Sequence, residues 1–190
     1  PHGGAALWSD SATIIPWTIY QLYGDTHILE NQYASMKKWI ETLRASETQL
    51  HLRQSGHQYG DWLALDIEHN SDRRMGATDP YLIASIFYAY STKILYQTAE
   101  ILGNEKDAKE YQHLYDGIIS GIRQEYITNT GRLVSETQTA CALVLLFDIV
   151  KEEHVPLIKK ILINNIDAHG GHLVTGFVGT PFICHALSKV

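Results

Sequence analysis

The sequence predicts an all-α fold in which antiparallel pairs of helices form part of an α/α toroid. Apolar residues recur at three- and four-residue steps along almost the whole chain, which is the period of an amphipathic helix. Short turns join the two helices of a pair, whereas longer loops that carry Trp, Asp, Gly and His join one pair to the next. This asymmetry is typical of helix pairs that wind around a centre and meet ligands on the long-loop face.

The first pair of helices is predicted on either side of Gly24. The first helix runs over residues 9–23, and Pro16 either kinks it or marks a start one turn later. Gly24 suits the position that follows a helix, and Asp25 can cap the second helix, whose apolar face ends near Leu43. The short turn predicts that these two helices are antiparallel neighbours.

Residues 46–77 interrupt the helical pattern and are rich in polar residues and glycine. A loop of this length in a compact helical domain is often functional. The helical pattern restarts with Asp79 as N-cap and Pro80 in the first turn, and it stops at Gly103. Asn104 then caps the partner helix, which completes a second pair.

The last third of the chain is expected to hold a third pair and one more helix. The expected elements, in order, are a hairpin or turn over residues 126–134, an interior helix over 137–150, its partner over 152–167, a stop at Gly170 and Gly171, an extended piece over 172–176, and a final helix that opens at Thr180-Pro181. No partner is expected for this final helix.

The composition indicates one folded domain over residues 1–190 and excludes several function classes. A hydrophobic content of 45% with 19% charged residues excludes disorder. The net charge of −6 and the absence of a basic run argue against a nucleic-acid partner and against an anionic membrane surface. Eleven Tyr and four Trp outnumber four Phe, and this amphipathic set is common where a protein meets sugars.

The cysteines predict a compartment, and the start of the chain predicts that it is a piece of a longer protein. Cys141 and Cys184 each lie in an apolar run, so we expect two buried, reduced thiols and a cytoplasmic location. No segment is long and apolar enough to span a membrane, and no signal peptide is visible. The chain opens with Pro1 rather than Met, and we expect it to be a piece of a longer protein.

Two Trp–Asp clusters are the candidate ligand sites. In Gln58-Tyr-Gly-Asp-Trp-Leu63, Asp61 offers two acceptors for hydroxyls and Trp62 offers a flat apolar face, which are the two features that a sugar ring requires. Trp8 and Asp10 repeat the combination just before a helix. The alternative is structural. In the first cluster Trp62 anchors the loop while Asp61 caps a turn, and in the second Ser9 or Asp10 caps the helix while Trp8 packs against it.

Other site chemistries are not predicted. The ten histidines do not show the spacing of a zinc-binding helix, so no metal is expected. The chain has no Gly-x-Gly-x-x-Gly, no Walker loop and no Gly-x-Ser-x-Gly, which excludes a nucleotide site or a serine esterase. No cofactor is therefore expected.

Several motifs in order along the chain resemble the bacterial α-L-rhamnosidases of glycoside hydrolase family 78. The motifs are Trp8-Ser-Asp-Ser, Pro16-Trp-Thr-Ile-Tyr-Gln-Leu-Tyr-Gly-Asp25, Tyr59-Gly-Asp-Trp-Leu63, Thr137-Gln-Thr-Ala140 and Leu173-Val-Thr-Gly-Phe-Val-Gly-Thr-Pro181. The resemblance implies an (α/α)6 six-hairpin barrel and hydrolysis of terminal α-L-rhamnosyl residues with inversion. It also implies that Trp8, Asp10, Asp61 and Trp62 bind a rhamnose-containing glycoside.

The same resemblance implies that this chain lacks catalytic residues. In the family the general acid lies upstream of the Trp-x-Asp helix and the general base lies downstream of the Gly-Thr-Pro helix, and neither stretch is present here. We therefore expect the isolated piece to be inactive. Part of a toroid exposes helix faces that the missing pairs would cover, so self-association is also expected.

Three other functions stay open at this point. The chain could be a non-catalytic carbohydrate-binding helical module, or part of another (α/α)6 glycosidase such as a glucoamylase-like or trehalase-like hydrolase. A tetratricopeptide-like scaffold is the third, but the 34-residue period of that repeat fails along this chain.

Overall fold

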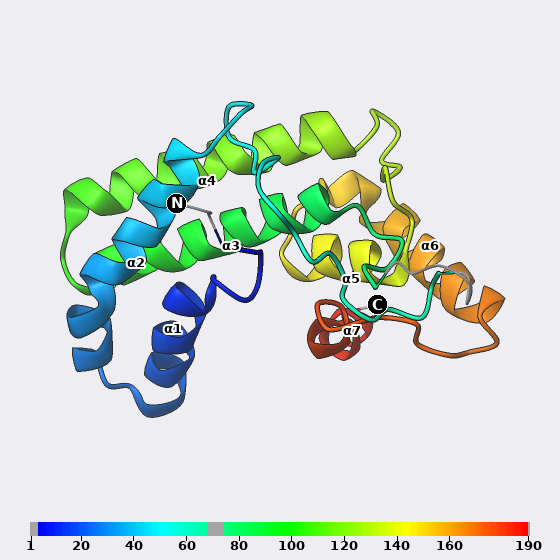
Figure 1. Cartoon of the computed structure of the whole chain (residues 1–190), viewed down its shortest axis with the longest axis horizontal. Helices are drawn as coiled ribbons and strands as arrows, with labels where there is room; N and C mark the ends of the chain where they lie inside the picture. Colours follow the sequence, from blue (N-terminus) through cyan, green and yellow to red (C-terminus); the bar gives the residue numbers. More distant parts are fainter. Residues whose placement is uncertain (1–3, 68–73, 190) are drawn as a thin grey trace. The chain divides into compact units, whose positions relative to one another are not determined.

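The computed structural model describes residues 4–67 and 74–189, and within these ranges the secondary structure is helical apart from three isolated β-bridges (Figure 1). This confirms the all-α prediction. The helices are α1 (Ser11–Tyr23), α2 (His27–Ala45), α3 (Pro80–Ile101), α4 (Glu105–Tyr126), α5 (Gln138–Leu146), a 3-10 turn (Glu152–His154), α6 (Val155–Ala168) and α7 (Thr180–Leu187).

The chain forms two compact units. The first is built from residues 1–57 and 87–121, and the second from residues 58–86 and 122–190. Helices α3 and α4 therefore contribute residues to both units. Each unit is described separately below.

In the first unit, α1 and α2 pack together as the predicted helix pair. Gly24 adopts φ +69°, and its N–H donates to the Tyr20 carbonyl at 2.7 Å, which ends α1 in the left-handed conformation that glycine favours. The Asp25 carboxylate accepts a hydrogen bond from the His27 N–H at 2.9 Å, so it satisfies the first amide of α2 as predicted. Pro16 lies inside α1, which starts five residues earlier at Ser11, so the proline does not mark the start of the helix.

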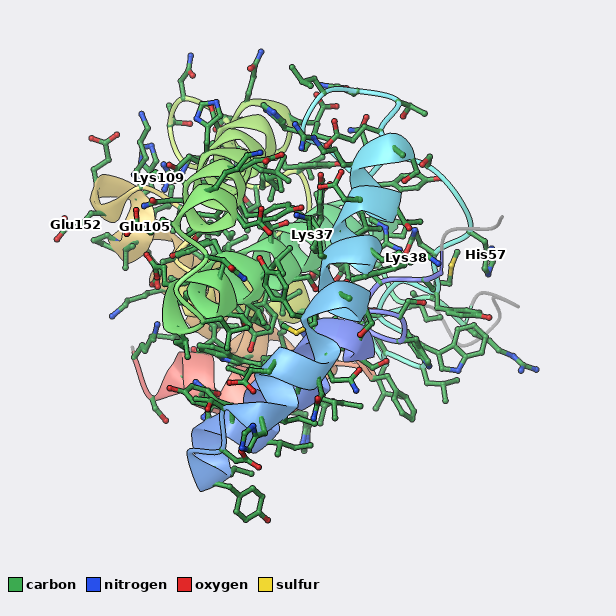
Figure 2. All side chains as sticks on the ribbon, turned by 90° about the vertical axis from the view of Figure 1, so that its left-hand side faces the viewer. Lys37, Lys38, His57, Glu105, Lys109 and Glu152 are labelled. Carbon is green, nitrogen blue, oxygen red and sulfur yellow. The ribbon has the colours of Figure 1, made fainter. Side chains whose placement is uncertain are left out.

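Polar contacts join α2 to α4 in the first unit. Lys37 Nζ and the Tyr33 hydroxyl both donate to Asp107 Oδ2, at 2.8 and 2.7 Å. One turn further, the Tyr111 hydroxyl donates to Glu41 at 2.7 Å. Lys37 and its neighbour Lys38 lie on opposite sides of α2 in Figure 2, so only Lys37 takes part in this contact.

The second unit contains the N-terminus of α3, which forms as predicted. Asp79 Oδ1 accepts hydrogen bonds from the N–H groups of Tyr81 and Leu82, both at 2.8 Å, so Asp79 caps the helix. The predicted hairpin over residues 126–134 is also present, with a bridge between Ile127 and Leu133.

Helix α5 forms the centre of the second unit, and both α6 and α7 pack against it. The side chains from Gln138 to Leu145 are all buried, which confirms the interior helix. The helix ends at Leu146 rather than at Val150, because Asp148 adopts φ +56° and the Ile149 N–H turns back to the Val144 carbonyl at 3.0 Å.

Two further predictions about this unit are corrected. Helix α7 was expected to have no partner, but it packs on α5 with Ile183 and Ala186 buried. Cys184 was expected to be buried with Cys141, but Cys184 is exposed, because it lies on the side of α7 opposite to Ile183 and Ala186 in the helical repeat. The predicted partner of α5 is a 3-10 turn followed by α6, and it ends where Gly170 and Gly171 adopt positive φ.

Candidate functional site

The four predicted ligand residues fall into two clusters, one in each unit. Trp8 and Asp10 belong to the first unit, and Asp61 and Trp62 belong to the second. In both clusters the carboxylate is fully buried, whereas the indole is partly exposed.

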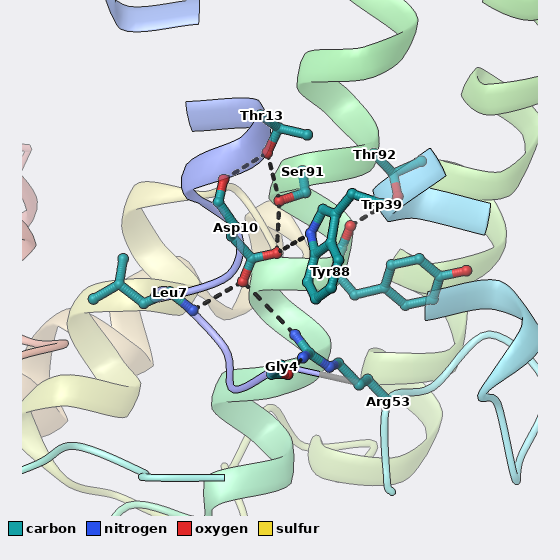
Figure 3. A network of polar contacts seen from close by, with 9 residues as sticks. All are labelled: Gly4, Leu7, Asp10, Thr13, Trp39, Arg53, Tyr88, Ser91 and Thr92. Atoms are coloured by element: carbon teal, nitrogen blue, oxygen red, sulfur yellow. Dashed lines mark hydrogen bonds and ion pairs between the residues drawn. The ribbon is translucent and has the colours of Figure 1, made fainter. Parts of the chain in front are cut away.

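Asp10 is the centre of a buried polar network (Figure 3). Its Oδ1 accepts hydrogen bonds from Trp39 Nε1 at 2.8 Å and from Ser91 Oγ at 2.9 Å. Its Oδ2 accepts the Leu7 N–H at 2.8 Å and lies 3.7 Å from Nη1 of Arg53. These partners come from α2, from α3 and from the loop that follows α2, so one carboxylate ties three segments to the start of α1.

Arg53 supplies the counter-charge of this network. Its side chain is almost fully buried, donates to the carbonyl of Gly4, and lies over the Trp39 ring at 5.3 Å from the ring centroid. Burial raises the pKa of Asp10, and the positive charge of Arg53 opposes that rise. Because both charges are removed from water, each depends on the other for compensation.

The Asp10 network shapes the turn that carries Trp8. Leu7 adopts φ +67°, and its N–H is the one that donates to Asp10. The Ser9 N–H reaches back to the carbonyl of Ala5 at 3.1 Å, which closes the turn. Within this turn 41% of Trp8 is exposed, so an apolar ring surface is accessible beside a carboxylate that is not.

Asp61 is the centre of a similar buried hydrogen-bond network in the second unit. Oδ1 accepts the N–H groups of Val178 and Gly179 at 2.8 and 3.0 Å. Oδ2 accepts the Gly176 N–H at 2.8 Å and the Thr139 hydroxyl at 2.5 Å. A carboxylate has about four acceptor positions, so these donors use the full capacity of Asp61.

Trp62 lies on the loop that Asp61 fixes. Its carbonyl accepts the Phe177 N–H at 2.8 Å, and its backbone pairs with Met75 in an antiparallel bridge. Its indole is half-buried, and the Tyr59 ring meets it edge-on with the centroids 5.6 Å apart. The guanidinium of Arg74 lies 5.9 Å from the indole centroid.

This geometry assigns different tasks to the two kinds of side chain. Asp10 and Asp61 hold loops together through donors that the protein itself provides. Trp8 and Trp62, in contrast, each keep part of their surface exposed to solvent. Direct contact of either carboxylate with a sugar hydroxyl stays a prediction.

Sequence reasoning missed the residues that complete both networks. Arg53 and Trp39 were not recognised as partners of Asp10, and Gln138 and Thr139 were quoted only as part of a motif. Polar residues inside strongly apolar helices were the available signal, since Thr-Gln-Thr opens a helix that is otherwise buried and apolar.

Among the residues that the structure describes, no group of three or more His, Cys, Asp or Glu side chains is placed to hold a metal ion. Burial raises the pKa of the Cys141 thiol to about 12, so this thiol is unreactive.

No helix in the described ranges has both the length and the apolar character that a membrane crossing requires.

Comparison with known proteins gives matches along the whole chain. Residues 1–190 match the family model described as the bacterial alpha-L-rhamnosidase 6 hairpin glycosidase domain. An alpha-L-rhamnosidase of Formosa agariphila is 35% identical over 99% of this chain. Among solved structures, native α-L-rhamnosidase from Aspergillus terreus superposes with a TM-score of 0.91 at 29% identity. The Streptomyces avermitilis enzyme, crystallised with L-rhamnose, superposes with a TM-score of 0.86 at 31% identity.

These matches confirm the six-hairpin fold class and the family resemblance. The two structural matches cover 97% of this chain. In contrast, the chain spans only 20% of the Formosa protein, 21% of the Aspergillus chain and 17% of the Streptomyces chain. It therefore corresponds to about one fifth of the length of these relatives.

Proposed function

This chain belongs to the family of bacterial α-L-rhamnosidase six-hairpin glycosidase domains, and we propose that it forms part of the catalytic domain of an inverting α-L-rhamnosidase. In this proposal the whole protein removes terminal α-L-rhamnose from a rhamnose-containing glycoside. The observation that carries it is the match of almost the entire chain, in sequence and in structure, to proteins named as α-L-rhamnosidases.

The chemistry requires two carboxyl groups. In an inverting hydrolase a general acid protonates the leaving oxygen while a general base activates water on the other face of the sugar, and the two groups lie about 6.5–9.5 Å apart. We propose that both come from parts of the protein outside this chain. The small share of the relatives' length that the chain spans supports this division.

The role of this chain is to bind the sugar. We propose that Trp8 and Trp62 present apolar ring faces to rhamnose, whose C–H groups and methyl group favour an aromatic plane. Asp10 and Asp61 belong to the same binding elements. Their burial and their hydrogen bonds to the two loops support a role in keeping each indole in place.

Turnover of an aryl α-L-rhamnoside tests the proposal. The full-length protein that contains this chain is expected to release the aryl group and to give β-L-rhamnose as the first product, which NMR detects before the anomers equilibrate. The isolated chain is expected to be inactive under the same conditions. Clear turnover by the isolated chain would overturn the division of catalytic groups, and an inactive full-length protein would overturn the activity.

Self-association of the isolated chain stays a prediction. On α1 the side chains of Ile15, Leu22 and Tyr23 are more than half exposed, which supports it. Sedimentation of the chain at several concentrations measures it directly.

A further inference from the structure

The first turn of α5 connects two loops of the second unit that are far apart in sequence. One loop is residues 58–66, which carry Trp62. The other is residues 172–179, which lead into α7. The side chain of Thr139 forms a hydrogen bond with the first loop, and the side chain of Gln138 forms hydrogen bonds with the second. Both residues are 1% exposed.

Gln138 binds the backbone of the second loop with both ends of its amide. Nε2 donates to the carbonyl of His172 at 3.1 Å, and Oε1 accepts the N–H of Val174 at 3.0 Å. The side chain therefore acts as a neighbouring strand would, and it fixes the residues that precede Gly176. A buried amide that is satisfied in this way allows little movement of the loop that it binds.

Thr139 reaches the first loop through Asp61. Its hydroxyl donates to Asp61 Oδ2, and the other three donors to Asp61 are backbone N–H groups of the second loop. Asp61 is thus held by α5 on one side and by the second loop on the other. It cannot shift without breaking buried, charge-assisted hydrogen bonds.

The position of Trp62 follows from these contacts. Trp62 is adjacent to Asp61 in the chain, and its carbonyl accepts the N–H of Phe177, which lies between two of the residues that bind Asp61. A Cβ on Gly176 would lie 2.7 Å from the Asp61 carbonyl oxygen, so the two loops approach as closely as glycine permits. The indole is held at its backbone while part of its ring stays exposed.

We infer that Gln138 and Thr139 are positioning residues for sugar binding by Trp62. They act through Asp61 and the 172–179 loop, and neither side chain touches the ligand. The inference rests on the proposed function, because it assigns the cause of the indole's position in a rhamnose site. Loss of the Thr139 hydroxyl is expected to weaken ground-state binding, which raises KM and leaves kcat nearly unchanged.

The test compares Thr139→Val with Thr139→Ser and Thr92→Val in the full-length protein. Thr92 is a matched control, since it is also buried on a helix but donates only to the carbonyl of Tyr88, at 2.8 Å. For Thr139→Val we expect KM for an aryl α-L-rhamnoside to rise on the order of tenfold, with kcat within about twofold of the parent. Thr139→Ser keeps the donor and is expected to behave like the parent, and Thr92→Val is expected to lower the melting temperature without moving KM.

A second readout does not depend on turnover. In protein labelled with 5-fluorotryptophan, the ¹⁹F resonance of Trp62 is identified by its loss in Trp62→Phe. Thr139→Val is expected to shift or broaden this resonance, and Thr92→Val is expected to leave it in place. If Thr139→Val does not fold, Gln138→Met removes the other contact and is expected to give the same two changes.

The outcomes separate the inference from the proposed function. An inactive parent protein whose Trp62 resonance still moves in Thr139→Val would contradict the rhamnosidase assignment and support the positioning. An active parent with an unchanged KM and an unmoved Trp62 resonance in Thr139→Val would overturn the inference. Equal rises of KM in Thr139→Val and Thr92→Val would also overturn it, because general loosening would then explain both.

Discussion

Substituting Gly176 by alanine is expected to separate the two loops that Asp61 joins. A Cβ at this position would lie 2.6 Å from the backbone nitrogen of Ala64 and 2.7 Å from the carbonyl oxygen of Asp61, against an ordinary contact of 3.4 Å or more. Both neighbours are backbone atoms, so no flexible side chain can move aside. The loops must therefore part by about 0.7 Å or more.

That separation breaks hydrogen bonds whose donors and acceptors are now 2.8 Å apart. The Gly176 N–H bond to Asp61 and the Phe177 N–H bond to the Trp62 carbonyl both have this length. Stretched beyond about 3.5 Å, each ceases to be a hydrogen bond. Loss of one charge-assisted and one neutral bond costs roughly 3–4 kcal/mol of unfolding free energy.

Urea unfolding of the chain, followed by the far-ultraviolet circular dichroism of its helices, measures this loss. Gly121→Ala is the matched control, because Gly121 lies within α4 and a Cβ there would meet its nearest atoms at 3.4 Å. This control is expected to be neutral or to gain about 0.5–1 kcal/mol, since alanine favours a helix over glycine. A Gly176→Ala chain within about 1 kcal/mol of the parent would refute the argument that close backbone approach fixes these loops.

Three further predictions concern buried and paired groups. In the native chain the exposed Cys184 is expected to react rapidly with a thiol reagent. Burial raises the pKa of Cys141 to about 12, so Cys141 is expected to react only after unfolding, and rapid reaction of both thiols in the native chain would contradict this. Asp10→Asn leaves Arg53 buried without its counter-charge and is expected to cost about 3–5 kcal/mol in a urea titration, so an unchanged midpoint would contradict the ion pair. Hydrogen bonds from Lys37 and Tyr33 hold the pKa of Asp107 below its ordinary value of 3.8. The contribution of ionised Asp107 to the free energy of unfolding is therefore full above pH 3.8 and is lost as the pH falls through the lower pKa of the folded state. The stability difference between the parent and Asp107→Asn is therefore expected to shrink as the pH is lowered below the ordinary pKa of 3.8, and a difference that grows would contradict it.

The ends of most helices could be predicted because they depend on local chemistry. Gly24, and Asp79 with Pro80, marked the end of one helix and the start of another, since positive φ and side-chain capping are properties of a few neighbouring residues. The end of α5 was not predicted, because the residue with positive φ there is Asp148, and the sequence pattern indicates this left-handed conformation only where glycine occurs.

The functions of the two buried carboxylates could not be predicted from local chemistry. The donors to Asp61 come from residues 78 to 118 positions further along the chain, and Ser91, which donates to Asp10, is 81 positions away. A Trp–Asp pair in a sequence indicates both an acceptor and an aromatic plane. Only the folded chain shows that the protein's own N–H and O–H groups occupy the acceptor while the plane stays accessible.

Calorimetric titration of L-rhamnose into the full-length protein tests most directly whether each of the two indoles contributes to sugar binding. Trp8→Ala and Trp62→Ala are each expected to weaken binding about tenfold or more, since stacking of a desolvated aromatic ring contributes at least this much to affinity. Binding as tight as that of the parent protein in both variants would contradict the account.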